Sequence, residues 1–143
     1  MQLPDRPTPA APRIVVRRAL PTAPADRGAA SPFLAEAERQ NLQPSRRMLY
    51  VGPEPAGERV AAALRIAAGA PVIARRKLLS ANGVPVRVAT SYFSADLFQA
   101  TRLAEPGFVE PSLQAAIAEL GHRFGYAVET LAARAATPAA RSR

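Results

Sequence analysis

The clearest pattern of apolar and polar residues lies mid-chain, where two segments rich in β-branched and apolar residues flank Asn82 and Gly83. These segments are residues 71–81 and 84–94. Asn-Gly is a preferred pair for a two-residue type I′ turn, because both turn positions need a positive φ. The pattern therefore predicts a β-hairpin, and a helix across residues 74–90 would contradict it.

Apolar residues at helical spacing predict two helices around this hairpin. The first covers residues 57–68, and Gly69 is expected to cap its C-terminal end. The second covers residues 110–120 and is expected to end at Gly121. The apolar faces of the two helices consist of Val60, Ala63, Leu64 and Ala67, and of Leu113, Ala116, Ile117 and Leu120.

Two more helices are expected from local signals. Ser31 can cap free backbone amides and Pro32 suits a first helical position, so a helix should run from Ser31 to about Gln40. Residues 95–101 should form a short helix.

The remaining strands are expected at residues 46–51 and 123–135. The Gly-Pro-Glu-Pro run at residues 52–55 should end the first of them. A third, short strand is possible at residues 14–16, Ile-Val-Val. Antiparallel strands with interspersed helices predict the α+β class, with an antiparallel sheet and flanking helices.

The composition indicates one domain preceded by a connecting segment. Residues 1–30 are rich in proline and arginine and are interpreted as a linker or tail. Residues 31–143 carry the regular pattern, and the 48% of apolar residues in the chain is enough for a modest core. Residues 137–143 are expected to be a frayed end.

Several kinds of chemistry are excluded by the residues present. The chain has no cysteine and one histidine, His122, so disulfides, thiolate sites and histidine metal clusters are ruled out. It has no glycine-rich phosphate loop and no nucleophile-elbow serine. No apolar run reaches the roughly 18 residues of a membrane span. We expect a cytoplasmic protein with no cofactor, no metal and no membrane partner.

The net charge of +8 and the pI near 11.3 leave two interpretations open. A basic protein favours anionic partners, including nucleic acid and phosphorylated small molecules. An arginine-rich, alanine-rich composition is also typical of a high-GC genome. Aromatic residues are only 6% and do not alternate with the basic residues as a base-stacking surface requires. A small basic nucleic-acid-binding protein remains an alternative.

The strongest candidate site is the cluster Arg75, Arg76 and Lys77. Side chains alternate along a strand, so Arg75 and Lys77 should face one way and Arg76 the other. This charge either protects an edge strand or lines a pocket for an anionic or hydroxylated ligand. Ser31 and Ser112 stand near helix starts, where they cap the helix or help to bind an anion.

The segment from Val72 to Leu97, VIARRKLLSANGVPVRVATSYFSADL, resembles the central hairpin of the UTRA domain, the effector-binding half of GntR-family regulators of the HutC subfamily. That family favours a basic strand, an A-D-G-x-P-V turn, then T-S-Y and D-L. Here these correspond to residues 81–86, to Thr90, Ser91 and Tyr92, and to Asp96 and Leu97. Similar matches at residues 31–33, 55–72, 112–121 and 129–138 extend the resemblance over about residues 31–140.

The resemblance implies a chorismate lyase-like fold, a cytoplasmic homodimer, and release from operator DNA when a small effector binds. Family members carry a winged helix-turn-helix before this domain and continue beyond the T-P motif. The chain is therefore interpreted as an effector-sensing domain of a repressor, without its DNA-binding domain and incomplete at its C-terminal end. A lyase-like enzyme on the same fold is the alternative.

The resemblance also implies a site. In amino-sugar-phosphate sensors of the family, the ligand is held by two strand arginines, a glutamate on the partner strand, and a serine and tyrosine at a helix start. These positions correspond to Lys77, Leu79, Ala89, Ser112 and Gln114. Because only Lys77 and Ser112 keep the chemistry, the resemblance predicts a less charged effector. The full set of predicted effector-binding residues is Lys77, Ser112, Arg75, Ser31, Gln114 and Tyr92.

Overall fold

The computed structural model describes residues 14–19, 33–34, 37 and 40–135. The chain divides into two units, residues 1–22 with 124–143 and residues 23–123. In the first unit, strand β1 (Ile14–Ala19) pairs antiparallel with strand β5 (Tyr126–Leu131). The short strand expected at residues 14–16 is confirmed and continues to Ala19. The strand expected over residues 123–135 is shorter, because Gly125 and the alanine-rich residues 132–135 have low β propensity.

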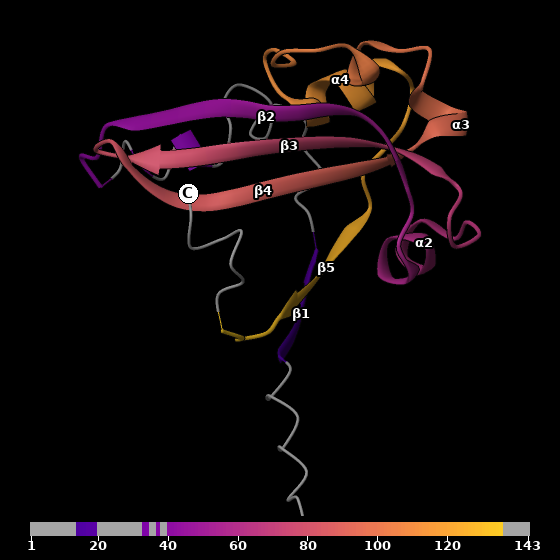
Figure 1. Cartoon of the computed structure of the whole chain (residues 1–143), viewed down its shortest axis with the longest axis horizontal. Coiled ribbons are helices and arrows are strands. Elements are labelled where there is room, and N and C mark those ends of the chain that lie inside the picture. Colours follow the sequence, from indigo (N-terminus) through magenta and orange to yellow (C-terminus); the bar gives the residue numbers. More distant parts are fainter. Residues whose placement is uncertain (1–13, 20–32, 35–36, 38–39, 136–143) are drawn as a thin grey trace, which may run out of the picture. The chain divides into compact units, whose positions relative to one another are not determined.

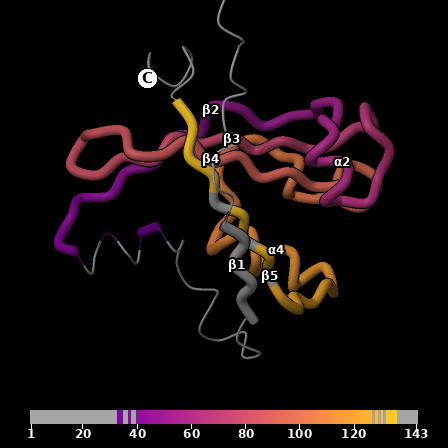
Figure 2. The backbone as a smooth tube through the Cα atoms, turned by 90° about the horizontal axis from the view of Figure 1, so that it is seen from below, coloured from indigo at the N-terminus to yellow at the C-terminus, as the bar shows by residue number. Residues whose placement is uncertain are grey.

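The second unit is built on a three-stranded antiparallel sheet (Figures 1 and 2). Its order is β2 (Pro44–Pro55), β3 (Pro71–Ala81) and β4 (Val84–Ser94). The predicted hairpin is confirmed, with φ of 49° at Asn82 and 76° at Gly83. The side-chain oxygen of Asn82 also accepts a hydrogen bond of 2.8 Å from the Gln43 amide, which joins the turn to the start of β2.

Strand β2 is longer than the sequence predicted. It does not stop at residue 51 but continues through the Gly-Pro-Glu-Pro run, with Pro53 opposite Ile73. Because β2 is an edge strand, a proline there need not donate to the ladder, so the run does not break the strand. The extra length brings Glu54 onto the sheet.

The expected helices exist but are shorter. Helix α2 (Glu58–Leu64) ends at Arg65, which takes the left-handed conformation with φ of 56°. The expected cap at Gly69 is wrong, since the Gly69 amide instead donates to the Ala56 carbonyl at 2.7 Å. Helix α3 (Ala95–Phe98) stops before the extended residue Thr101, which caps a one-turn 3-10 helix, η2 (Arg102–Ala104).

Helix α4 (Leu113–Glu119) begins three residues later than expected, directly after Ser112. Gly121 follows its end with φ of 89°, as predicted. Of the helix expected from Ser31, the described residues Phe33, Leu34 and Ala37 are helical, and its predicted start lies outside the described residues.

Each face of the sheet carries its own apolar cluster. On what we call the α4 face, Ile73 packs with Phe98, Leu103 and Ala116, so α3, η2 and α4 lie on this side (Figure 1). On what we call the α2 face, Val72 packs with residues around α2. Strand alternation assigns Ile73, Arg75, Lys77 and Leu79 to the α4 face, and Val72, Ala74, Arg76 and Leu78 to the α2 face.

The sheet and its helices confirm the α+β class. Within the described residues, no helix is long and apolar enough to span a bilayer.

Candidate functional site

Arg75 is a buried cation that holds a loop. Its side chain is on β3, the residue is 3% exposed, and its guanidinium donates to three backbone carbonyls. These belong to Leu103 at 2.7 Å, Glu105 at 2.8 Å, and Gly107. Burial lowers the pKa of Arg75, and the carbonyl dipoles are its described partners. Arg75 therefore fastens the segment between η2 and α4 to the sheet.

Lys77 lies two residues further along the same face and is half-buried. Burial lowers the pKa of Lys77, and the charges of Arg46, Arg87 and Arg75 lower it further. Among the described residues, no carboxylate lies within ion-pair distance of Lys77. The α4 face thus presents an ammonium group with excess positive charge around it.

The arginines that act on Lys77 come from both neighbouring strands. Arg46 of β2 and Arg87 of β4 each stand directly opposite Leu79 of β3. Side chains of directly opposed residues point to the same face, with Cβ atoms about 4.5–5.5 Å apart. Two guanidinium groups therefore flank the position where the family resemblance had suggested a lost charge.

Sequence reasoning missed Arg46 and Arg87. Counting back from the Asn-Gly turn without interruption pairs Arg87 with Leu78 and places it on the α2 face. A register shift between Leu79 and Ser80 moves Arg87 opposite Leu79 instead, onto the α4 face. Pro85 stands at the shift, and proline in a strand is found at edges or at bulges, but it does not by itself fix the face on which Arg87 lies.

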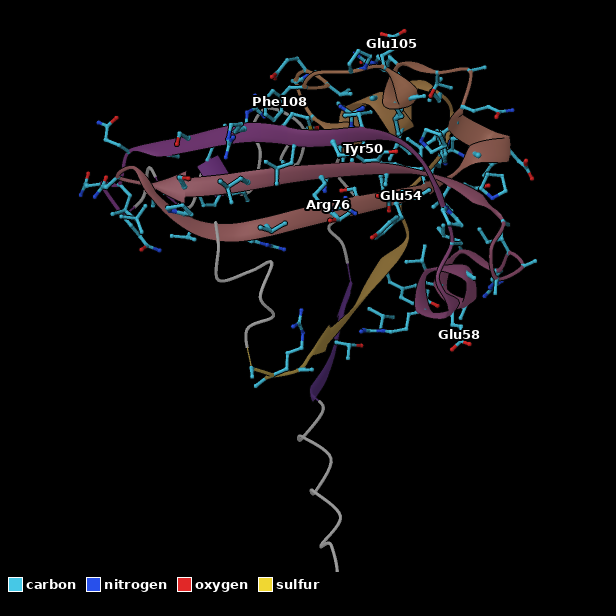
Figure 3. All side chains as sticks on the ribbon, in the orientation of Figure 1. Tyr50, Glu54, Glu58, Arg76, Glu105 and Phe108 are labelled. Atoms are coloured by element: carbon cyan, nitrogen blue, oxygen red, sulfur yellow. The ribbon has the colours of Figure 1, made fainter. Side chains whose placement is uncertain are left out.

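Arg46 also contacts the loop before α4. Its guanidinium forms an ion pair of 2.5 Å with the Glu110 carboxylate and lies 4.3 Å from the ring centroid of Phe108. Figure 3 labels Phe108 in this loop. The main-chain carbonyl of Glu110 accepts a hydrogen bond of 3.0 Å from Arg102, which separately pairs with Glu119 at 2.5 Å. The loop is thus held by side chains on both sides of Glu110.

Ser112 and Gln114 lie where α4 starts. The Ser112 hydroxyl is buried and accepts a hydrogen bond of 3.1 Å from the Ala115 amide, so it caps α4. Gln114 is half-buried in the first turn of the helix. Both residues belong to the helix that covers the α4 face, the same side of the sheet as Lys77.

The other two predicted site residues do not join this group. Tyr92 stands opposite Ala74 and packs against the apolar cluster of the α2 face, so the sheet separates it from Lys77. Ser31 lies outside the described residues.

The α2 face has a charge cluster of its own, in which the charges are matched. Arg76 donates to both carboxylate oxygens of Glu54, at 3.0 and 3.3 Å, and to the Thr90 hydroxyl at 3.3 Å. Burial lowers the pKa of Arg76, but hydrogen bonds to Glu54 and Tyr92 and the charge of Glu54 outweigh it and raise that pKa. Figure 3 shows Arg76, Glu54 and Tyr50 on the strands.

Among the described residues, no three histidine, cysteine, aspartate or glutamate side chains lie close enough together to hold a metal ion. The charged side chains that the strands present on the α4 face are cations, which suit an anionic or hydroxylated small molecule.

Comparison with known proteins identifies the family of the chain. The family model for the UTRA domain matches residues 39–143. The chain also resembles the effector domain of PhnF from Mycobacterium smegmatis, with 31% identity over 66% of this chain and 56% of that chain, and a TM-score of 0.49. It therefore spans just over half the length of that solved chain.

UTRA domains are regulatory effector domains and not enzymes, so the lyase-like alternative is wrong. Because the match covers most of its residues, this chain belongs to the UTRA family and is an effector domain of a GntR-type transcription regulator.

Proposed function

We propose that a small-molecule effector binds on the α4 face and thereby controls the affinity of the regulator for operator DNA. The observation that carries this proposal is the half-buried Lys77, which has no described carboxylate partner and lies on the face that α4 covers. A cation that is partly desolvated and unmatched is ready to bind an anionic or polar group of a ligand.

The predicted residues take different parts in this proposal. Lys77 makes the charge-assisted contact, while Arg75 shapes the adjoining loop through its three carbonyl contacts. Ser112 and Gln114 offer polar groups at the start of α4. Ser31 and Tyr92 stay predicted contacts with less support, since one lies outside the described residues and the other on the α2 face.

The proposal extends to the regulator as a whole. Residues 31–143 form the effector-binding region. Residues 1–30 connect it to other parts of the protein, and within them β1 pairs with β5. The regulator acts in the cytoplasm as a homodimer, and a winged helix-turn-helix of the same regulator contacts the operator. In the described residues, no pair of helices has the arrangement that places a recognition helix in a major groove. The effector domain itself is therefore not the DNA-reading part.

The proposal is tested by screening the 143-residue chain for thermal stabilisation with a panel of phosphorylated sugars, carboxylic acids, amino acids and neutral sugars. A compound that raises the melting temperature is then measured by calorimetry on Lys77→Gln and Ser112→Ala. We expect Lys77→Gln to lose about 1–3 kcal/mol, or roughly 5- to 150-fold in affinity. Arg59→Gln, which removes an exposed cation from α2, is the matched control and should bind normally. Unchanged affinity in both site variants would place the pocket elsewhere.

A further inference from the structure

The α4 face carries four cations and, among the described residues, one carboxylate that contacts any of them. The cations are Arg46, Arg75, Lys77 and Arg87, and the carboxylate is that of Glu110. Arg75 is bound to backbone carbonyls, which leaves Arg46, Lys77 and Arg87 as what we call the cationic cluster. One carboxylate against three cations leaves the cluster with an excess of positive charge.

The ion pair between Glu110 and Arg46 is weak enough for another anion to replace the Glu110 carboxylate. The Glu110 side chain is 62% exposed and that of Arg46 is 23% exposed, so this ion pair lies at the surface. Surface ion pairs contribute little net stability, because water and salt compete with them. A ligand anion that reaches all three cations at once would therefore displace a carboxylate that pairs with one.

The loop that carries Glu110 is attached through three arginines, Arg75, Arg46 and Arg102. Residues 103, 105 and 107 are fixed to β3 through the buried Arg75. Residues 108 and 110 are held by Arg46, through the ring of Phe108 and the carboxylate of Glu110. Arg102 separately holds the main-chain carbonyl of Glu110 at 3.0 Å. Loss of the contacts to Arg46 would leave the other two attachments in place, so the side chains of Phe108 and Glu110 would be freed while the Glu110 backbone stays bound to Arg102.

From these contacts we infer that Glu110 is an internal counter-ion of the cationic cluster, and that an oxyanion of the effector binds by displacing it from Arg46. The inference rests on the proposed effector site and specifies its chemistry. Two guanidinium groups and an ammonium group offer several donors to a phosphoryl or carboxylate group. Displacement releases the Glu110 side chain from Arg46 and loosens the contact with Phe108, while the Glu110 backbone stays bound to Arg102.

This inference revises the expectation of a less charged effector. That expectation rested on Leu79 and Ala89, which replace charged residues in the family comparison. The register shows that Arg46 and Arg87 flank Leu79 on both sides, so the charge missing from β3 is supplied by β2 and β4.

The test uses the full chain with inorganic phosphate and, separately, acetate at constant ionic strength, followed by backbone amide NMR shifts. We expect phosphate to shift amides of the cationic cluster and of residues 108–112. In Glu110→Gln its affinity should rise about three- to fivefold, the effect of removing one exposed ion pair. Arg87→Gln, an exposed position that can be changed without loss of packing, should weaken phosphate binding at least as much. Tighter binding of acetate than of phosphate would identify the oxyanion as a carboxylate.

Glu58→Gln is the matched control, because it removes an exposed carboxylate from α2 and changes the net charge equally. If Glu58→Gln tightens phosphate binding as much as Glu110→Gln does, the effect is general charge and the inference is overturned. It is also overturned if neither anion shifts the amides of the cluster in the wild type or in Glu110→Gln. An effector that depends on Lys77 and Ser112 but not on Glu110 or Arg87 would sink the inference and leave the proposed function intact.

Discussion

The two faces of β3 differ in whether a neighbouring carboxylate balances the charge of their cations. On the α2 face, Arg76 is matched by Glu54 through two contacts and by Thr90. On the α4 face, Lys77 meets further positive charge and no described carboxylate. A matched pair of charges holds strands together and has little left to offer a ligand. An unmatched, partly desolvated charge costs stability and is a marker of a binding site.

A second difference lies within the α4 face itself. Arg75 is more buried than Lys77, yet its guanidinium is compensated by three carbonyl groups of one loop. Burial alone therefore does not make a cation available to a ligand. What matters is whether its donors already form hydrogen bonds within the protein. Arg75, Arg76 and Lys77 thus have three different roles: Arg75 holds a loop, Arg76 pairs with a carboxylate, and Lys77 is left without a described counter-ion. Variants can separate these roles.

The largest effect is expected for Arg75→Met. This change removes the donors of three carbonyl groups at the buried edge of the loop and should cost about 3 kcal/mol of the free energy of unfolding. Urea denaturation monitored by circular dichroism measures it. Arg47→Met changes an exposed arginine of β2 and should stay within about 0.5 kcal/mol of the wild type. A loss of less than about 1 kcal/mol in Arg75→Met would show that the loop is held by other contacts.

The division between the two faces could be predicted from sequence where the signals were local. The Asn-Gly pair fixed the hairpin, because positive φ at both positions is a property of those two residues. Strand alternation then separated Arg76 from Arg75 and Lys77, as observed. The cap of α4 by Ser112 is local in the same way.

What the sequence could not provide depends on register and on distant contacts. The register shifts at Leu79/Ser80 and Met48/Tyr50 are not determined by local sequence alone, and the first of them decides which face Arg87 occupies. Glu110 meets Arg46 across 64 residues of sequence. Continuation of β2 through Pro53 depends on its place at the sheet edge, which only the fold reveals. The unmatched charge of the α4 face is therefore a property of the tertiary structure.

A smaller loss in the free energy of unfolding is expected when the ion pair between Arg76 and Glu54 on the α2 face is removed. Glu54→Gln removes the carboxylate that holds Arg76, and should cost about 1 kcal/mol because one Arg76 nitrogen contacts both carboxylate oxygens but the pair remains partly screened by solvent. A double-mutant cycle with Arg76→Gln isolates the coupling between the two side chains. Coupling indistinguishable from zero would mean that the α2 face is no better matched than the α4 face, and the contrast between them would fail.

The smallest effect has the opposite sign and sets the α4 face apart most directly. Lys77→Met removes a desolvated, repelled charge and should stabilise the effector-free chain by roughly 0.5 kcal/mol, since solvent screens part of the repulsion. Because the folded-state pKa of Lys77 is lowered from its ordinary value of 10.5, the unfolded chain binds more protons between the two values. Wild-type stability therefore rises with pH in that window, and the advantage of Lys77→Met should be greatest near neutral pH and shrink towards pH 10.5. Melting temperatures from pH 7 upwards measure this, with Arg76→Met as the matched change on the other face, where stability should fall. If Lys77→Met is also destabilising at neutral pH, other groups of the free protein already compensate the charge of Lys77. The α4 face would then have no unpaired cation for an effector.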